Sequence, residues 1–433
     1  MAYGLIKIGT INIRKKDNCY DLITDVNDNG VTKELFFTVD IKYAEYLATE
    51  RSDAFVTVLL YYAMFNGYDI QWEIPCTEQL IYQLTAYYIP ICAKEISFMH
   101  PISLMGKTTS EALQCEGGVG TGFSGGVDSC YTIKKHLETY YIENRLTHLL
   151  FTDCFTVDFS EKYQKDFLDK YLHNLPGQAE ELGLEFIFVR CNIDILFSIG
   201  RYQDPVCGEI IDGGLFTLKY CSMAMALQKL FQIYYFSGGV SPTDFTFLSY
   251  DCAYYDMFTL PLLSTKGLQF YSAGMEVNRM EKVEAISDWK FAQKHLQVCI
   301  WDNDGNCGHC GKCIRTMSEL YVLDKLEYFK ERFPVEDYKR HLNKRFGKVL
   351  MEAHKGHIFE KDILFQMEES GKKIPFLAYV LCPFYLLIEW TRLKLKKVRW
   401  ARKLYRKFHL DKMLYGRSTE EYSQSVDKEV LRK

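Results

Sequence analysis

The sequence predicts an α/β protein whose core is a parallel sheet, and three observations support this fold class. Between residues 116 and 236, short apolar segments alternate with segments of helical length, as in parallel strands joined by crossover helices. A glycine-rich loop at 123–129 stands between the first predicted strand and a helical pattern. Four cysteines follow within residues 299–313. We therefore expect an N-terminal domain at 1–115, a central domain at 116–320 and a helical C-terminal region at 321–433.

The composition is that of an ordinary folded protein. Hydrophobic residues make up 48% and charged residues 25% of the 433 residues, and the net charge of −4 does not favour a nucleic-acid binder. The N-terminal residues lack a basic segment followed by an apolar one, so we expect no secretory signal. The fifteen cysteines are then expected to be reduced thiols plus a metal site, in a cytoplasmic protein.

The first 115 residues predict an accessory β-rich α+β domain. Strands are predicted at 5–8, 11–13, 20–23, 35–39 and 68–74, with a turn signal at Asn27–Gly30. A helix is expected to begin after Ser52 and to end at Asn66-Gly67, and another to begin at Thr77. No set of catalytic groups is apparent in this region, so we expect it to pack on the central domain or to gate it.

The central domain predicts further strands at 148–153, 184–189 and 233–236. Between them, helices are predicted from Ser160, with a break or kink at Pro176-Gly177, and over 215–231. Ligands in parallel sheets bind at the carboxyl ends of strands, where the 123–129 loop is expected. A second run of similar residues, 237–240, precedes Pro242 without a helical pattern, which indicates a turn at a strand end.

The 123–129 loop has the residues of a phosphate-binding site. Gly125 and Gly126 allow close backbone approach, a helix N-terminus favours anions, and the Ser124 and Ser129 hydroxyls can donate hydrogen bonds. Asp128 can hold Mg²⁺ or position a ribose or a water. The alternative is an ordinary glycine turn with a serine or aspartate cap. No Walker sequence Gly-x-x-x-x-Gly-Lys-Ser/Thr is present in the loop.

Two further cations are candidates for catalysis. Arg279 and Lys282 are three residues apart and can share one helix face, where they would stabilise the negative charge of a leaving pyrophosphate. The alternative is a surface helix with ordinary glutamate–lysine pairs.

The late cysteines have the spacing of a metal site. They follow the pattern C-x7-C-x2-C-x2-C, which suits tetrahedral Zn²⁺ better than an iron–sulfur cluster. Four thiolates would close the coordination shell, so a structural role is expected. We call these residues the four-cysteine cluster: Cys299, Cys307, Cys310 and Cys313. His309 could substitute for one ligand, but we expect it to be a bystander.

The loop Ser124–Ser129, Ser-Gly-Gly-Val-Asp-Ser, matches the PP-loop pattern Ser-Gly-Gly-x-Asp-Ser of the ATP pyrophosphatase superfamily. Members cleave ATP to AMP and pyrophosphate and adenylate a carbonyl or carboxylate oxygen. With the late four-cysteine cluster, the chain resembles the 7-cyano-7-deazaguanine synthase family. That resemblance implies an adenine nucleotide alpha hydrolase-like core and conversion of a deazapurine carboxylate to an amide and then a nitrile, using ATP and ammonia.

The resemblance also implies site residues and cofactors. It implies that ATP phosphates and Mg²⁺ are held by Ser124, Gly125, Gly126, Asp128 and Ser129, and Zn²⁺ by Cys299, Cys307, Cys310 and Cys313. It covers residues 116–320, whereas the typical synthase is little more than this core. Residues that would recognise a deazapurine are not identifiable, so the acceptor, a carboxylate or nucleobase-like substrate, stays open.

Two alternative functions remain beside an ammonia- or amine-dependent ligase. One is sulfur transfer to tRNA, which other PP-loop enzymes perform and which would make cysteines redox-active or cluster-bound. The other is a regulatory module that binds nucleotide without turnover. Ala2 follows Met1, so we expect no N-terminal glutaminase cysteine to supply ammonia. The sequence leaves the oligomeric state open.

The C-terminal region predicts a possible contact with a membrane surface or with RNA through residues 374–412. Ile374–Trp390 is apolar but too short and too interrupted to span a bilayer, and predicts an apolar hairpin. Residues 392–412 contain ten Lys/Arg and one acidic residue among apolar and aromatic side chains. A basic aromatic helix of this kind can lie on an anionic membrane surface or contact RNA. The alternative is a helix packed on the protein with solvated charges.

Overall fold

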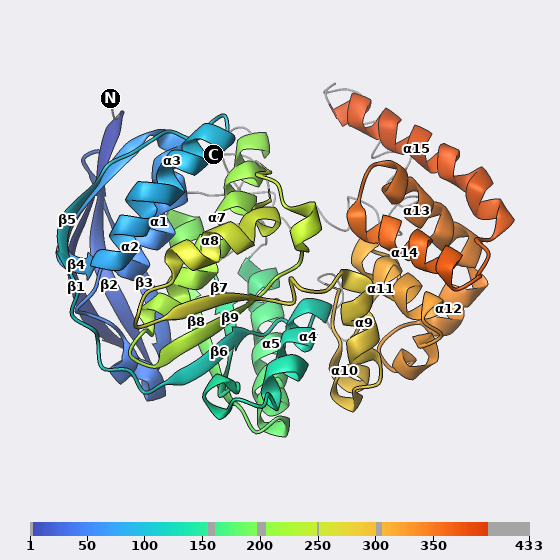
Figure 1. Ribbon diagram of the computed structural model, residues 1–433, viewed down its shortest axis with the longest axis horizontal. Coiled ribbons are helices and arrows are strands. Elements are labelled where there is room, and N and C mark those ends of the chain that lie inside the picture. The colour runs from blue at the N-terminus through green and yellow to red at the C-terminus, as the bar shows by residue number, and fades with distance from the viewer. Residues whose placement is uncertain (1–2, 155–160, 197–204, 249–250, 300–304, 397–433) are drawn as a thin grey trace. The chain divides into compact units, whose positions relative to one another are not determined.

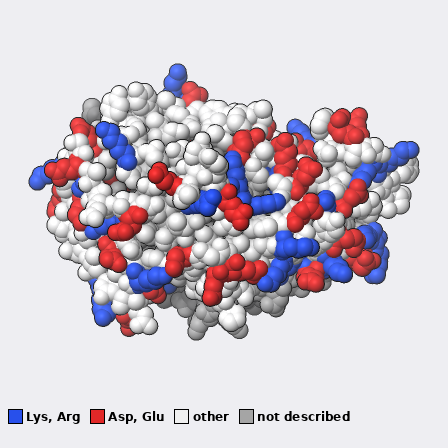
Figure 2. Space-filling view, turned by 60° about the horizontal axis from the view of Figure 1, so that its bottom comes forward, with Lys and Arg blue, Asp and Glu red and all other residues white. Residues whose placement is uncertain are grey.

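The computed structural model describes residues 3–154, 161–196, 205–248, 251–299 and 305–396. These residues form two compact units (Figure 1). Unit 1 comprises the described parts of 1–123, 132–158 and 171–276, and unit 2 those of 124–131, 159–170 and 277–433. Figure 2 shows both signs of charge interspersed over the face drawn, in keeping with the small net charge.

The described strands of unit 1 form one ten-stranded sheet in the order β10-β9-β6-β7-β8-β3-β2-β1-β4-β5. Their bounds are β1 Gly4–Lys16, β2 Cys19–Asp28, β3 Val31–Asp40, β4 Tyr68–Thr77, β5 Leu104–Thr109, β6 Gly118–Gly122, β7 His148–Asp153, β8 Glu185–Cys191, β9 Phe231–Ser237 and β10 Gln269–Ala273. Strands β6 to β10 pair with one another in parallel. The predicted α/β class, with a mostly parallel sheet, is confirmed.

The strand order creates a switch point at β6. This strand lies between β7 and β9, so the chain adds β7 and β8 on one side of β6 and β9 and β10 on the other. Crevices at the carboxyl ends of such strands are the usual ligand sites of open α/β sheets. The glycine loop follows β6 directly, as predicted. The second run, 237–240, begins at the last residue of β9 and continues into a loop, so its expected position at a strand end is confirmed.

The N-terminal strands do not form a sheet of their own, which differs from the predicted domain boundary at residue 115. Strand β3 pairs antiparallel with β8, with Val39 opposite Val189. The Asn192 side chain reinforces this junction because it accepts from the Phe36 N–H and donates to the Glu34 carbonyl, both at 2.9 Å. Residues 1–115 therefore extend the central sheet.

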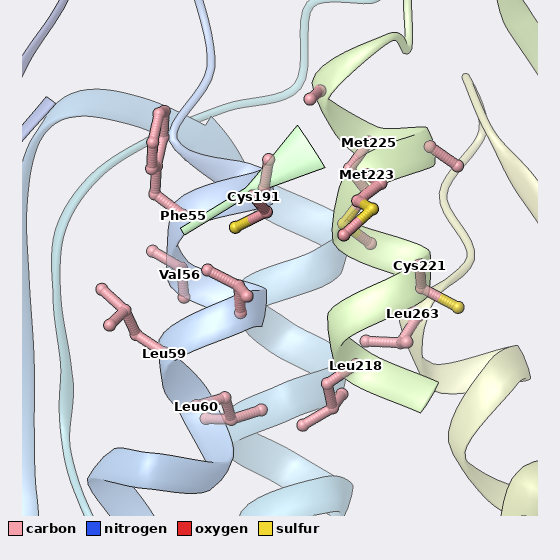
Figure 3. Packing of buried hydrophobic residues seen from close by; sticks show 14 of the residues in the cluster. Phe55, Val56, Leu59, Leu60, Cys191, Leu218, Cys221, Met223, Met225 and Leu263 are labelled. Atoms are coloured by element: carbon pink, nitrogen blue, oxygen red, sulfur yellow. The ribbon is translucent and has the colours of Figure 1, made fainter. Parts of the chain in front are cut away.

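Helix α1 explains why this region belongs to the larger core. It spans Asp53–Asn66 and ends, as predicted, at Gly67, whose φ of 69° is in the left-handed region. Nearly all its residues are buried, and a helix that is apolar all round needs cover on every side. Figure 3 shows its side chains beside helix α7, Pro205–Ala226, and the Thr57 hydroxyl lies 3.3 Å from the Met225 sulfur.

The other α-helices with residues in unit 1 connect the strands. They are α2 Glu78–Gln83, α3 Ile89–Glu95, α4 Val127–Leu137, α5 Glu161–Glu181, α6 Ile193–Leu196 and α8 Asp256–Leu263. Helix α5 continues through Pro176, so of the predicted break or kink the break is absent. Its predicted cap, Ser160, lies outside the described residues. The helix predicted over 215–231 ends at Ala226 and begins ten residues earlier.

The described residues of unit 2 are helical apart from its loops. Its helices are α9 Arg279–Ser287, α10 Lys290–His295, α11 Gly311–Val322, α12 Val335–Arg340, α13 Leu342–His354, α14 Ile358–Glu369 and α15 Phe376–Lys396. The predicted helical C-terminal region is confirmed, but its predicted start at 321 falls inside α11 because α11 packs with α13 and α14.

Helix α15 replaces the predicted apolar hairpin, because the chain stays helical through Pro383. Of the basic segment at 392–412, residues 397–412 lie outside the described part of the chain. No helix in the described part of the chain has both the length and the apolar content needed to cross a membrane.

Candidate functional site

The glycine loop has the backbone conformation expected of an anion cradle. Gly125 has a φ of +74°, which residues with a Cβ rarely adopt. Helix α4 begins two residues later at Val127, and its first N–H groups have no partner within a helix. The Ser129 hydroxyl donates to the Gly126 carbonyl at 3.0 Å, and Ser124 is exposed. The loop is therefore held in shape from inside while its outer edge stays open to a ligand.

Asp128 receives hydrogen bonds from both predicted cations. The Lys282 ammonium donates to Oδ1 at 3.1 Å, and the Arg279 guanidinium donates to Oδ2 at 3.3 Å. Burial would raise the pKa of Asp128, but the positive charges of Lys282, Arg279 and Lys312 lower it below its ordinary value. Its side chain is 30% exposed, so an ionised carboxylate remains within reach of solvent.

The structure thus brings Asp128, Arg279 and Lys282 together. Helix α9 is capped by Asn278 through a capping box with Glu281, which sets Arg279 at its first position. Arg279 and Lys282 leave α9 on the same face, and the Lys282 side chain is only 1% exposed. The alternative of a solvated surface helix does not describe these two side chains.

Helix α11 holds the Arg279 guanidinium from another side. Arg279 donates to the Glu319 carboxylate at 2.9 Å and to the Thr316 hydroxyl at 3.3 Å. Glu319 is fully buried, and burial raises its pKa while the Arg279 charge opposes that shift. The Phe359 ring lies under Arg279, with its centroid 5.5 Å from the guanidinium carbon. Arg279 is therefore fixed in orientation before any ligand arrives.

The four cysteine sulfurs converge to the size of a tetrahedral metal site. Cys307 and Cys313 are 3.8 Å apart, Cys310 and Cys299 are 3.9 Å apart, and all four sulfurs lie within 4.8 Å of one another. A tetrahedral zinc with bonds of about 2.3 Å to sulfur requires edges of about 3.8 Å. The predicted cluster can therefore hold a metal ion such as zinc.

Local backbone structure produces this convergence. The Asn306 side chain accepts from the N–H groups of Val298 and Cys299, and donates to the Leu296 carbonyl at 2.9 Å. This folds Cys299 back onto the later cysteines. Gly308 has a φ of +72°, and a Cβ there would lie 2.4 Å from Pro334. Only glycine fits this turn.

Backbone amides and cations surround the cysteines. Cys307 accepts from the N–H groups of His309 and Cys310, both at 3.4 Å, which favours a thiolate. The His309 Nδ1 lies 3.0 Å from the Arg345 guanidinium, which donates to it, so this nitrogen is an acceptor and the expected bystander role is in keeping with the geometry. The Lys312 and Lys348 ammonium groups also interact electrostatically with Cys310. Positive charge would therefore offset part of the negative charge that four metal-bound thiolates would carry.

The glycine loop and the four-cysteine cluster are joined through Gln297. Its backbone N–H donates to the Gly125 carbonyl at 2.8 Å, and its side chain donates to the Cys299 carbonyl at 2.8 Å. Arg332 in turn donates to the Gln297 side-chain oxygen at 2.7 Å. Val127 and Cys130, in the first turn of α4, also share one hydrophobic cluster with Cys299 and Cys313.

Sequence reasoning missed the residues that hold the predicted ones. Gln297, Thr316, Glu319 and Phe359 lie at none of the motif positions. A signal was present for two of them, since Cys313, Thr316 and Glu319 recur at three-residue spacing on the helix that begins at the cluster. Gln297 and Phe359 carry no such periodic signal.

Comparison of the chain with protein-family models, with curated proteins and with solved structures finds no match.

Proposed function

We propose that the chain is an ATP pyrophosphatase that adenylates a carboxylate or related carbonyl oxygen for attack by ammonia or an amine. The observation that carries this proposal is the loop Ser124–Ser129, whose Asp128 is contacted by both Arg279 and Lys282. The loop matches the PP-loop pattern, and the cations supply the positive charge that cleavage between the α- and β-phosphates requires.

The charge arrangement suits a polyphosphate. Arg279, Lys282 and Lys312 all act on the carboxylate of Asp128, and Arg279 also pairs with the Glu319 carboxylate, so three cations face two carboxylates. Entering phosphates can take over the hydrogen bonds that Lys282 and Arg279 now give to Asp128. In the transition state these cations would stabilise the charge that develops on pyrophosphate, the leaving group.

Asp128 would then hold Mg²⁺. Mg²⁺ prefers carboxylate and phosphate oxygens, and the lowered pKa of Asp128 keeps this side chain ionised at neutral pH. Arg279 keeps its contact with Glu319 throughout, so its position does not depend on Asp128.

Zinc in the four-cysteine cluster would be structural. Four thiolates at tetrahedral distances leave no coordination position for substrate or water. We assign its role to holding Cys299 and α11, and through them Gln297 and Glu319. A closed zinc site also favours the ligase over sulfur transfer to tRNA, which would need a cysteine that reacts or a cluster with a free iron position.

The acceptor follows from the resemblance to 7-cyano-7-deazaguanine synthases. A deazapurine carboxylate is the first candidate, and ammonia the first nucleophile. Attack of the carboxylate oxygen on the α-phosphorus would release pyrophosphate, and attack of ammonia on the acyl adenylate would release AMP and form the amide.

The test is product analysis by mass spectrometry. The purified protein is incubated with Mg-ATP, ammonium and 7-carboxy-7-deazaguanine, alongside Asp128→Asn and the surface control Asp288→Asn, whose side chain is 65% exposed. We expect AMP, pyrophosphate and an amide or nitrile from the wild type and the control, and none from Asp128→Asn. AMP and pyrophosphate with an unmodified deazapurine would keep the ATP chemistry and exclude this acceptor. Tight nucleotide binding without AMP would favour a regulatory module.

A further inference from the structure

Helix α15 presents an apolar face to solvent. Between Phe376 and Thr391, where its side chains are described, the large exposed residues are apolar or aromatic and each is 47–79% exposed: Phe376, Leu377, Tyr379, Val380, Phe384, Leu387 and Trp390. At about 100° per residue these positions cover roughly half of the helix circumference. Contiguous exposed apolar surface of this kind is unusual on a protein surface and marks an interaction site.

The opposite face of α15 packs against unit 2. Ala378, Tyr385 and Ile388 are buried, and the helix packs along α13 (Figure 1). Gly347 of α13 permits this close approach, since a Cβ there would lie 3.1 Å from both Leu381 and Tyr385. One face of the helix therefore holds it to the rest of unit 2. The exposed apolar face does not take part in this packing.

Charge on and after α15 is strongly one-sided. From Phe376 to Thr391 the one acidic or basic residue is Glu389, and it is buried. Directly afterwards, residues 392–412 carry ten Lys/Arg and one acidic residue. An uncharged apolar face thus leads, in the sequence, into a strongly basic segment.

We propose that α15 docks on the surface of an anionic lipid membrane. Apolar side chains would enter the boundary between headgroups and acyl chains, with Trp390 and Tyr379 at the level where such rings are favoured. The basic residues that follow would be attracted to anionic headgroups. A second copy of the chain would cover the apolar face but would not use the basic charge. RNA would use the charge but not the aliphatic side chains.

The test is sedimentation of the full-length protein with phosphatidylcholine vesicles, with and without phosphatidylglycerol. We expect binding to the anionic vesicles and binding at least about tenfold weaker to the neutral ones. The variant Val380→Glu/Leu387→Glu places charge at the centre of the face and should weaken binding to the anionic vesicles about tenfold or more. Its matched control, Ile142→Glu, alters an exposed residue of unit 1 and should bind as the wild type does.

A second variant separates the two components of the surface. Replacing Arg399, Arg402, Arg406 and Lys407 with glutamine should weaken binding to anionic vesicles and leave binding to neutral vesicles unchanged. The proposal is overturned if the wild type binds neither vesicle, or if Val380→Glu/Leu387→Glu binds as the wild type does. Absence of vesicle binding together with a dimer that Val380→Glu/Leu387→Glu dissociates would identify a second copy as the occupant. Absence of vesicle binding together with tRNA binding that the glutamine variant loses would identify RNA.

Discussion

Gln297, which stands two residues before Cys299, donates a hydrogen bond of 2.8 Å from its backbone N–H to the carbonyl of Gly125. The same residue's side chain donates to the Cys299 carbonyl. The conformation of the glycine loop therefore depends on the chain segment that leads into the four-cysteine cluster. This relationship makes the four-cysteine cluster and the glycine loop parts of one arrangement within unit 2.

The loop conformation can be tested at Gly125. Gly125→Ala places a Cβ at a φ of +74° and 3.3 Å from the Gln297 Cβ. We expect the free energy of unfolding to fall by about 1–2 kcal/mol and ATP affinity to fall with it, because the loop must shift. Urea unfolding and calorimetric titration with Mg-ATP measure both. The control is Gly239→Ala in the second glycine run, where a Cβ meets no atom within 4 Å. Equal ATP affinity in Gly125→Ala and the wild type would contradict the assigned role.

Removing a ligand of the four-cysteine cluster should lower the affinity of the glycine loop for ATP. Cys313→Ser removes one ligand and loosens the first turn of α11, so we expect loss of bound zinc and a fall of about 3 kcal/mol or more in the free energy of unfolding. ATP affinity should also fall in the fraction that stays folded, because Gln297 and Glu319 lose their supports. Metal analysis by mass spectrometry and nucleotide titration provide the measurements. Cys382→Ser, in α15, should retain one zinc per chain and normal affinity. Unchanged ATP affinity in zinc-free, folded protein would count against the coupling.

Glu319 should act as a positioning residue for Arg279. In Glu319→Gln the Arg279 guanidinium keeps its hydrogen bond to Asp128. It loses the ion pair with the buried Glu319 carboxylate, which lies 2.9 Å away in the wild type. Breaking one partner of a buried ion pair costs about 3–5 kcal/mol, so the free energy of unfolding should drop by that order. A purely structural role would leave the KM for ATP unchanged in the folded protein, whereas a positioning role raises it. Glu284→Gln, an exposed substitution on α9, is the control and should change neither quantity.

Asp256 should make stability depend on pH. This carboxyl group of unit 1 accepts a hydrogen bond from the Thr217 hydroxyl, and burial raises its pKa to about 7. Between about pH 4 and pH 7 the folded protein then binds more protons at this site than the unfolded chain, so stability falls as the pH rises through that window. The loss should reach about 4 kcal/mol above pH 7.

Asp256→Asn is the variant that isolates this effect. It cannot ionise, so the free energy of unfolding should lose this component of its decline between pH 4 and pH 7. Urea unfolding at a series of pH values tests this. A decline of the same size in wild type and Asp256→Asn would show that other groups cause it.

The glycine loop and the four-cysteine cluster were predictable because each is a local pattern. Six consecutive residues fix the loop, and the spacing of Cys299, Cys307, Cys310 and Cys313 fixes the convergence of the sulfurs. The pairing of β3 with β8 was not predictable, since it joins Val39 to Val189 and leaves no periodic signal in either strand. The apolar character of α1 over its whole circumference was the available hint that residues 1–115 share a larger core.

The environment of Arg279 and the exposed face of α15 could not be predicted from the sequence either. Spacing placed Arg279 and Lys282 on one helix face, but Asp128 is 151 residues away from Arg279 in the chain and only the fold brings them together. Composition marked Ile374–Trp390 as apolar. It could not distinguish the residues that pack on α13 from those that face solvent, because both sets are apolar.

The most direct test of the proposed chemistry follows the oxygen atoms. The protein is incubated with Mg-ATP, ammonium and 7-carboxy-7-deazaguanine labelled with ¹⁸O in its carboxylate, and AMP and pyrophosphate are analysed by mass spectrometry. Adenylation of the carboxylate predicts AMP that carries one ¹⁸O and pyrophosphate that carries none, with both products absent in Asp128→Asn. Unlabelled AMP, or ADP and phosphate in place of AMP and pyrophosphate, would contradict it.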